Sequence, residues 1–510
     1  MTKISMAWLA AVAMGTIAAW GEGETVVANG TPPGLPQLDL EACARLALER
    51  NLDLRMVRLE REEAELDVGI ARGGYDPTLS LRAGRDHSET SGQSAGTADG
   101  ALETVRTEKD DDSVSASVGG KVGWVGTEYE VAARSGDSSG KRGGNPFDTS
   151  SGSIGVTVSQ PLLKGFRTDE TRYRIATAEV LSEEAALALE ERVQNLLADV
   201  EKAWYTLLAA RQARVVQVEA VRLAEQLLAD NRRKVQIGTM SSLDEKQAES
   251  QAASARADLA SAEQSVVQAE NALKALVFAD LRNVWQLELP VAGELAPPPA
   301  GTMPPDPGAA MDGALAQRPD LRSARLALER QGLAVDLYKN QTLPELNLVG
   351  GYGLAASDED SAGDAWSTIA DADEPYWNVG VTLSIPIGNR AARNRHKQSL
   401  AAQERATLHV RKLEEDALGE IVNASASVNA CLLRVAASRD AAEYARDALQ
   451  AEQRKLDQGK STSFVVLQLQ KNLTEARRAE TAALADYYKS LADFSLAEGS
   501  MLSRHSLLLD

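Results

Sequence analysis

Aromatic residues are scarce in this chain of 510 residues, since Phe, Trp and Tyr together make up only 4% of it. That scarcity excludes a thick core filled with aromatic side chains, so Ala and Leu must carry most of the packing. Cysteine is nearly absent as well. Cys43 and Cys431 are far apart in sequence, which rules out a disulfide framework and leaves room for at most one bridge.

Basic residues are in deficit, because 54 Lys and Arg stand against 74 Asp and Glu and give a formal net charge of -20. A phosphate-binding basic surface is therefore disfavoured, and we predict no nucleic-acid partner. The four histidines, His87 among them, lack the spacing of a metal site. No nucleophile, base and orienting residue share a recognisable spacing either, so the sequence predicts no enzyme, catalytic residue, metal or cofactor.

The N-terminus has the pattern of an export signal. Lys3 precedes an apolar stretch that ends in Ala19, Trp20 and Gly21, which predicts a signal peptide over residues 1–21. An uncleaved single-span anchor is the alternative, but the apolar run is shorter than the ~20 residues that a spanning helix needs. We expect no later run of that length. The exported chain is then either soluble or crosses an outer membrane as β-strands.

Self-comparison shows that one pattern occurs twice in the chain. Residues 76–81 match 343–348 at an offset of 267, and residues 155–162 match 380–387 at an offset of 225. The drop in offset places an insertion of 42 residues in the first copy, between Gly84 and Gly155. Each copy reads as a helix, two strands, a long helix, a turn and a second helix.

The patterns divide the chain into consecutive segments. They are the signal peptide 1–21, an N-terminal linker 22–37, a first helix 38–75, strands 76–160 with a loop or insertion 86–151, an α-hairpin 165–280, a Pro-rich linker 281–313, a helix 314–342, strands 343–387, an α-hairpin 389–498 and a tail 499–510.

The predicted strands alternate apolar with small or polar residues, as Ile154, Val156 and Val158 show. This period of two fits membrane-barrel strands, or a half-buried sheet in a soluble domain. The acidic, Ser-rich tract 86–151 reads as a solvent loop, although 114–131 alternates enough to form an extra hairpin, within the sheet or outside it. Four prolines mark the strand ends: Pro77, Pro161, Pro344 and Pro386.

The segments after the strands predict long helices, because residues 169–237 contain no Pro or Gly. Apolar residues recur there in steps of four and three from Leu189 to Ala210, which is a heptad seam. Such a helix is about 100 Å long at 1.5 Å per residue. Turns at Gly238 and Gly459 reverse the two long helices. A dimeric coiled-coil stalk would also explain the seam, but it leaves the strands unexplained.

Four strands per chain are too few for a closed membrane barrel, which needs about eight. If the strands cross a membrane, several chains must share one barrel, and three chains would supply twelve strands. The membrane interpretation therefore predicts a homo-oligomer.

The repeated motifs resemble those of the TolC-type outer membrane efflux proteins over about residues 38–498. The motifs are Asp-Leu-Arg and Pro-x-Leu-x-Leu in both copies, Gln-Pro-Leu-Leu at 160–163, and Gly-x-x-x-Ser turns followed by Gln. The resemblance implies an α+β membrane protein: a homotrimer whose twelve-stranded outer membrane β-barrel, four strands from each chain, continues into a long periplasmic α-helical barrel.

That resemblance also implies a function without catalysis. The trimer would sit in outer membrane lipid as the exit duct of a tripartite efflux or type I secretion system. Its periplasmic tip would open when a periplasmic adaptor protein and an inner membrane transporter dock. A periplasmic adaptor of the membrane-fusion class and an exported structural coiled-coil protein are the alternatives, but such adaptors generally hold one hairpin, whereas this chain has two.

By the same resemblance, the two turns form the pore tip and the adaptor contact. Gly permits the positive φ that ends a helix, and Ser can cap the N-terminus of the next one. Alternatively, the residues only make the turns. The predicted tip residues are Gly238, Thr239, Ser242, Gly459, Lys460 and Ser463.

The best-known family member has acidic residues six and nine positions after the second turn Gly, where this chain has Val465 and Gln468. Asp244 in the first hairpin and Asp457 beside the second turn are therefore our candidates for a pore gate. Like charges near a three-fold axis repel each other and attract cations, which favours a narrow, cation-selective mouth. The other interpretation is that both are solvated charges at helix ends.

Overall fold

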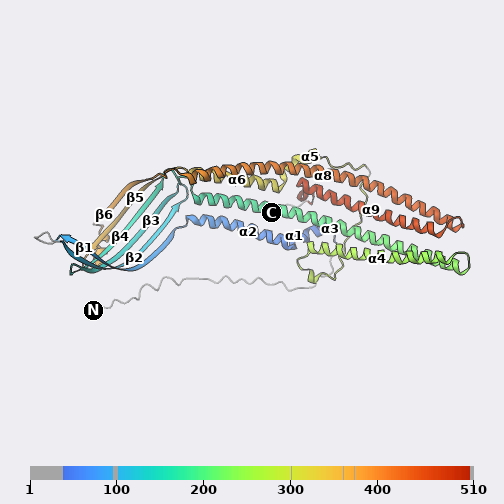
Figure 1. The fold of residues 1–510 in the computed structure, drawn as a ribbon, viewed down its shortest axis with the longest axis horizontal. Coiled ribbons are helices and arrows are strands. Elements are labelled where there is room, and N and C mark those ends of the chain that lie inside the picture. Colours follow the sequence, from blue (N-terminus) through green and yellow to red (C-terminus); the bar gives the residue numbers. More distant parts are fainter. Residues whose placement is uncertain (1–37, 96–101, 300, 360, 373, 506–510) are drawn as a thin grey trace.

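The computed structural model describes residues 38–95, 102–299, 301–359, 361–372 and 374–505. The molecule is elongated, with a β-sheet at one end and helices that run from it to the other end (Figure 1). The predicted signal peptide 1–21, the linker 22–37 and the last five residues of the predicted tail lie outside the described residues.

Six strands form one antiparallel sheet in the order of the chain. They are β1 (Thr78–Ala95), β2 (Leu102–Val122), β3 (Thr127–Arg142), β4 (Asn145–Pro161), β5 (Glu345–Asp358) and β6 (Pro375–Ser384). A short helix, α7 (Ala362–Ala370), connects β5 to β6 and packs on the sheet.

The prediction of four strands is therefore wrong, and so is the prediction of a solvent loop over 86–151 where the structure describes it. The alternative of an extra hairpin over 114–131 within the sheet is confirmed, because this tract comprises parts of β2 and β3 and the turn between them. The loop prediction failed because the ends of β1 to β4 far from the helices carry charged or hydroxyl side chains on both faces, so no apolar alternation marks them. In β1 this polar stretch begins at Arg85.

Helices make up most of the rest of the described chain. They are α1 (Leu40–Arg50), α2 (Leu52–Arg72), α3 (Glu170–Gln236), α4 (Ser242–Val277), α5 (Pro307–Gln317), α6 (Pro319–Asn340), α8 (Arg390–Asp457), α9 (Ser463–Glu498) and α10 (Met501–Arg504), with short 3₁₀ turns η1 (Gly73–Tyr75) and η2 (Leu281–Asn283).

Each helix that was predicted before a strand pair is two helices. Asn51 separates α1 from α2, and its side chain accepts a hydrogen bond from the Leu54 N–H at 3.0 Å, as an N-cap does. In the second copy Pro319 begins α6 directly after α5, because Pro is tolerated in the first turn of a helix but not inside one.

Two long helices organise the helical part. α3 packs against α2 near the sheet and against α4 farther away, and α8 packs in the same way against α6 and then α9 (Figure 1). The α3–α4 and α8–α9 hairpins end together at the end of the molecule opposite the sheet. The predicted repeat is thus visible as two similar helical layers.

The largest apolar core lies midway along the helices, where α1, α3, α4, α10 and the linker after α4 meet. Leu54, Leu197, Leu273 and Met501 are fully buried in it. A second core joins α5, α8 and α9. Cys43 and Cys431 are both buried and free, so the single bridge that the sequence left open is not formed.

Among the described helices, α8 is long and apolar enough by composition to cross a membrane, contrary to the expectation that no such run follows the N-terminus. Part of its apolar surface has partners within the chain. Ile421, Val428 and Val435 are buried in the core that α8 shares with α5 and α9. In all, 28% of the apolar window is buried inside the chain, so packing between these helices covers only part of this stretch.

Candidate functional site: the hairpin tips

Both hairpins turn through a glycine in the left-handed region, as the sequence predicts. Gly238 has φ +77° and Gly459 has φ +72°. The residue after each glycine donates its backbone N–H to a carbonyl of the preceding helix, from Thr239 to Lys234 at 2.9 Å and from Lys460 to Lys455 at 2.8 Å. These bonds close both helices at their C-termini in a Schellman-like arrangement.

The serines that the sequence assigns to helix caps have other roles. In the first hairpin the cap is Ser241, whose hydroxyl accepts from the Leu243 N–H at 3.2 Å, and Ser242 is exposed. In the second hairpin Thr462 occupies the cap position, and Ser463 is 1% exposed. Ser463 points into the molecule because it lies on the face of α9 that packs against α3.

Ser463 joins the two hairpins. Its hydroxyl donates to Oδ1 of Asn231 on α3 at 3.1 Å, and Asn231 is fully buried. The Asn231 amide donates to the Asp244 carbonyl at 3.3 Å, so one side chain connects α3, α4 and α9. Asn231 was not predicted from the sequence, although it falls on the continuation of the α3 heptad seam, where a polar residue specifies pairing.

Apolar contacts accompany this polar link. A cluster of buried side chains from α3, α8 and α9 lies just behind the turns and ties the hairpins together within one chain. Its members are Leu227, Leu449, Val466, Leu467 and Leu473.

The outer surface of the tip is apolar in places. Ile237, Leu243 and Phe464 are 73%, 64% and 58% exposed. Leu243 and Phe464 occupy equivalent positions in the two repeats, one residue after Ser242 and Ser463. Three such side chains around two exposed turns make a surface suited to a protein partner. None of the three was predicted from the sequence.

The two candidate gate carboxylates lie near the same tip but in different surroundings. Asp244 is half-buried in the first turn of α4, where the helix dipole stabilises a negative charge. Asp457 is exposed at the C-terminal end of α8. A third carboxylate near the tip, Glu452 on α8, accepts hydrogen bonds from neighbouring side chains. Hydrogen bonds from Lys455 and then Ser461 hold the pKa of Glu452 below its usual value.

The four predicted strand-end prolines all lie at the helical side of the sheet. Pro77 and Pro344 directly precede β1 and β5, Pro161 ends β4, and Pro386 follows β6 by two residues. A proline suits these positions because it cannot donate a hydrogen bond to a neighbouring strand.

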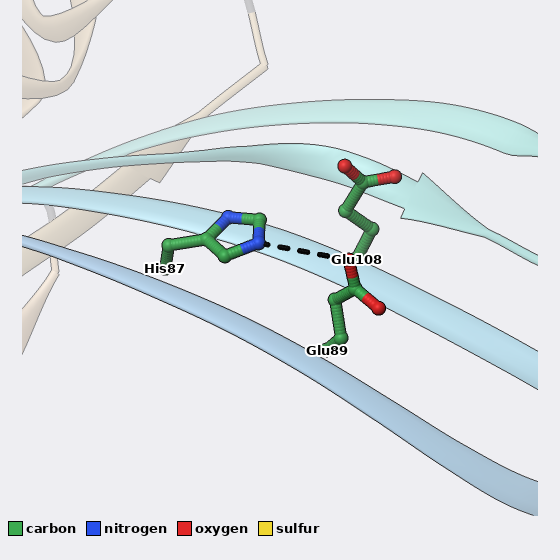
Figure 2. Close-up of side chains that lie close together, drawn as sticks. All are labelled: His87, Glu89 and Glu108. Carbon is green, nitrogen blue, oxygen red and sulfur yellow. Dashed lines mark ion pairs between the residues drawn. The ribbon is translucent and has the colours of Figure 1, made fainter.

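One histidine cluster forms at the other end of the molecule, on β1 and β2. Figure 2 shows His87 with Glu89 and Glu108, whose ligand atoms all lie within 4.8 Å of one another. Pairing between strands creates this group, so the spacing in sequence did not reveal it. Arg106 already pairs with Glu89, and Asp110 is 2.8 Å from His87 Nδ1. We therefore describe it as an exposed ion-pair network.

Comparison with known proteins agrees with this architecture. The model of the outer membrane efflux protein family matches residues 125–277 and 310–500, more than half of the chain. The chain is 27% identical over 354 residues to the outer membrane efflux protein BepC of Brucella suis, which covers 68% of this chain and 72% of BepC. It is 23% identical over 355 residues to the outer membrane protein TolC of Vibrio cholerae, which covers 68% and 77%.

Solved structures share the fold at lower identity. The outer membrane channel OprN superposes with a TM-score of 0.66 at 18% identity, covering 90% of each chain. The open-state MtrE channel of Neisseria gonorrhoeae gives a TM-score of 0.64 at 19% identity, covering 91% of this chain and 89% of MtrE.

Proposed function

The chain belongs to the outer membrane efflux protein family, and we propose that three copies form the outer membrane exit duct of a tripartite efflux pump or a type I secretion system. The family places it in the outer membrane as an efflux channel, so the periplasmic adaptor and the exported coiled-coil protein are both excluded. The finer roles, meaning the trimer, the docking partners and the opening tip, are our proposal.

The observation that carries the proposal is that the long helices hold the β-sheet and the hairpin tips at opposite ends of the molecule. A sheet with an exposed apolar face lies at one end, and paired hairpin tips lie at the other. The 67 residues of α3 alone place about 100 Å between them. Such a molecule can hold its sheet in lipid while its tips reach far into the periplasm.

We propose that the tip surface contacts the adaptor through the exposed turn residues Gly238, Thr239, Ser242, Gly459 and Lys460, together with Ile237, Leu243 and Phe464. Ser463 belongs to the tip in a different way, since it is buried and holds the hairpins together. Docking of the adaptor on the surrounding surface would change the hydrogen bond between Ser463 and Asn231.

The test of the duct is direct. The protein is extracted from outer membranes, its mass is measured in detergent, and its current is recorded in a planar bilayer. We expect a trimer with a small resting conductance. A soluble monomer or dimer without conductance would overturn the proposal.

The gate proposal for Asp244 and Asp457 has its own test. If these carboxylates line the mouth, Asp244→Asn and Asp457→Asn reduce the preference for cations over anions, most clearly at low salt, where charges are least screened. Asp312→Asn, an exposed change on α5 far from the tip, is the control. Unchanged selectivity in both tip variants would contradict a charged gate.

A further inference from the structure

The 42-residue insertion of the first repeat has become strands β2 and β3. They lie between β1 and β4 in the sheet, whereas β5 and β6, the two strands of the second repeat, pair directly with each other. We propose that β2 and β3 belong to the membrane wall, and that β1 of one copy pairs with β6 of the next to close a barrel of eighteen strands. This inference rests on the proposed trimeric duct.

The apolar face of the sheet continues through the inserted strands without a break. Residues that face each other across paired strands point to the same side of a sheet, so each register row shows one face. One row crosses all six strands: Leu79, Val118, Val131, Val156, Tyr352 and Trp377. A hairpin that projected into water would have no need of Val118 and Val131 in that row.

The opposite face carries small or polar residues on β1 to β5, and on β6 Tyr376 lies over the glycines of this row. The adjacent row consists of Ser80, Ser117, Ala132, Gly155, Gly353 and Tyr376. Such residues suit the water-filled interior of a channel, while the apolar row suits lipid. β2 and β3 therefore have the two faces that a barrel wall requires.

The two edges of the sheet point to a second copy of this chain as their partner. Within the described residues, β1 pairs only with β2, and β6 only with β5, so each leaves one backbone edge open. In lipid an open edge is too costly to persist. β1 and β6 run in opposite directions because an even number of strands alternates between them, so the next copy can continue the same antiparallel pattern. Trp377, Val379 and Val381 on β6 are exposed, and they would continue the apolar face toward β1 of the next copy.

Neighbouring alanines on β3 provide a matched test in the trimer reconstituted into liposomes. Ala133 lies on the lipid-facing side, paired with Ala116 and Ile154, and Ala132 lies on the interior side, paired with Ser117 and Gly155. We expect a spin label on Ala133→Cys to be relaxed by oxygen and protected from a water-soluble nickel chelate. The label on Ala132→Cys should show the reverse. Access of the chelate to both would overturn the proposal.

Cross-linking separates this proposal from the duct itself. Leu81 faces Ala116 directly on the neighbouring strand, and Ile154 is three strands away from Leu81, or about 14 Å. Leu81→Cys with Ala116→Cys should therefore form a disulfide, and Leu81→Cys with Ile154→Cys should not. A trimer that forms the second bridge has β1 next to β4, which overturns the eighteen-stranded wall and leaves the duct intact. Loss of the trimer overturns both.

Discussion

The Ser463 hydroxyl donates to Asn231 Oδ1 at 3.1 Å, across the boundary between the two hairpins and in a buried setting. Removing it with Ser463→Ala leaves the Asn231 oxygen buried without that donor, at a cost of about 1 to 3 kcal/mol to the joined state. Each 1.4 kcal/mol is about a tenfold change in an equilibrium. We therefore expect open events in bilayer recordings to become at least several-fold more frequent.

Ser461→Ala is the control for that prediction. Its hydroxyl bonds to Glu452 within the second hairpin at 2.5 Å and does not join the hairpins. An equal rise in opening for both variants would show that general loosening of the turn, rather than the link to Asn231, is responsible.

Long helices and their turns were predictable from the sequence because their signals are local. The absence of Pro and Gly over 169–237, the heptad seam and one glycine per turn specify each hairpin. The strand count was not predictable in the same way. The ends of β1 to β4 far from the helices are polar on both faces, and only hydrogen bonding to neighbouring strands makes Asp110 or Ser138 part of a sheet.

The hydrogen bond between Asn231 and Ser463 at the tip was partly predictable from the sequence. A buried Asn in the α3 seam is a visible signal, but its partner Ser463 is 232 residues away along the chain. Without the fold, a cap at the start of α9 was the simpler role for Ser463.

A pH dependence is expected from the cluster around Arg318. Its guanidinium bonds to Asp320 and to Glu420, both at 2.7 Å, and so joins α6 to α8. Burial raises the pKa of Asp320, but the bonds from Arg318 outweigh that effect and hold the pKa below its ordinary value. The resulting stability is present above the ordinary carboxyl pKa, near 4, and is lost as the pH falls through the lowered one.

Asp320→Asn should therefore lower the thermal midpoint in detergent at pH 7, and the difference from the unchanged protein should shrink as the pH falls below 4. Asp312→Asn, on the exposed side of α5, is the control and should show no such convergence. A difference that stays constant from pH 7 to pH 3 would contradict the role of the ionised carboxylate.

Gly155 in β4 makes room for Tyr376 on the face of the sheet opposite the apolar row. A Cβ atom at Gly155 would lie 2.5 Å from the Tyr376 hydroxyl oxygen. Gly155→Ala should therefore destabilise the sheet by about 1 to 2 kcal/mol, as overpacking does. Tyr376→Phe removes the clashing oxygen, so the double variant should recover most of the loss in a double-mutant cycle of thermal unfolding. Additive losses would show that the strain has another source.

Residues 499–505, the described part of the segment predicted as a C-terminal tail, pack against the central core. Met501 is fully buried, and Arg504 on α10 bonds to Glu201 of α3 at 2.8 Å. The Glu201 side chain is only 1% exposed, so Arg504→Ala would leave a buried carboxylate without its main partner. Breaking one side of such a pair costs about 3 to 5 kcal/mol, and we expect a correspondingly large fall in stability to denaturant in detergent.

Glu201→Gln distinguishes the charge from the packing of α10. If the uncompensated carboxylate is the cause, adding Glu201→Gln to Arg504→Ala restores most of the lost stability, because a neutral amide is far cheaper to bury than an ion. Arg504 also donates to the Leu491 carbonyl at 3.1 Å and to the Ser495 hydroxyl at 2.9 Å, so the recovery should be incomplete. A double variant as unstable as Arg504→Ala would instead assign the loss to those contacts with α9.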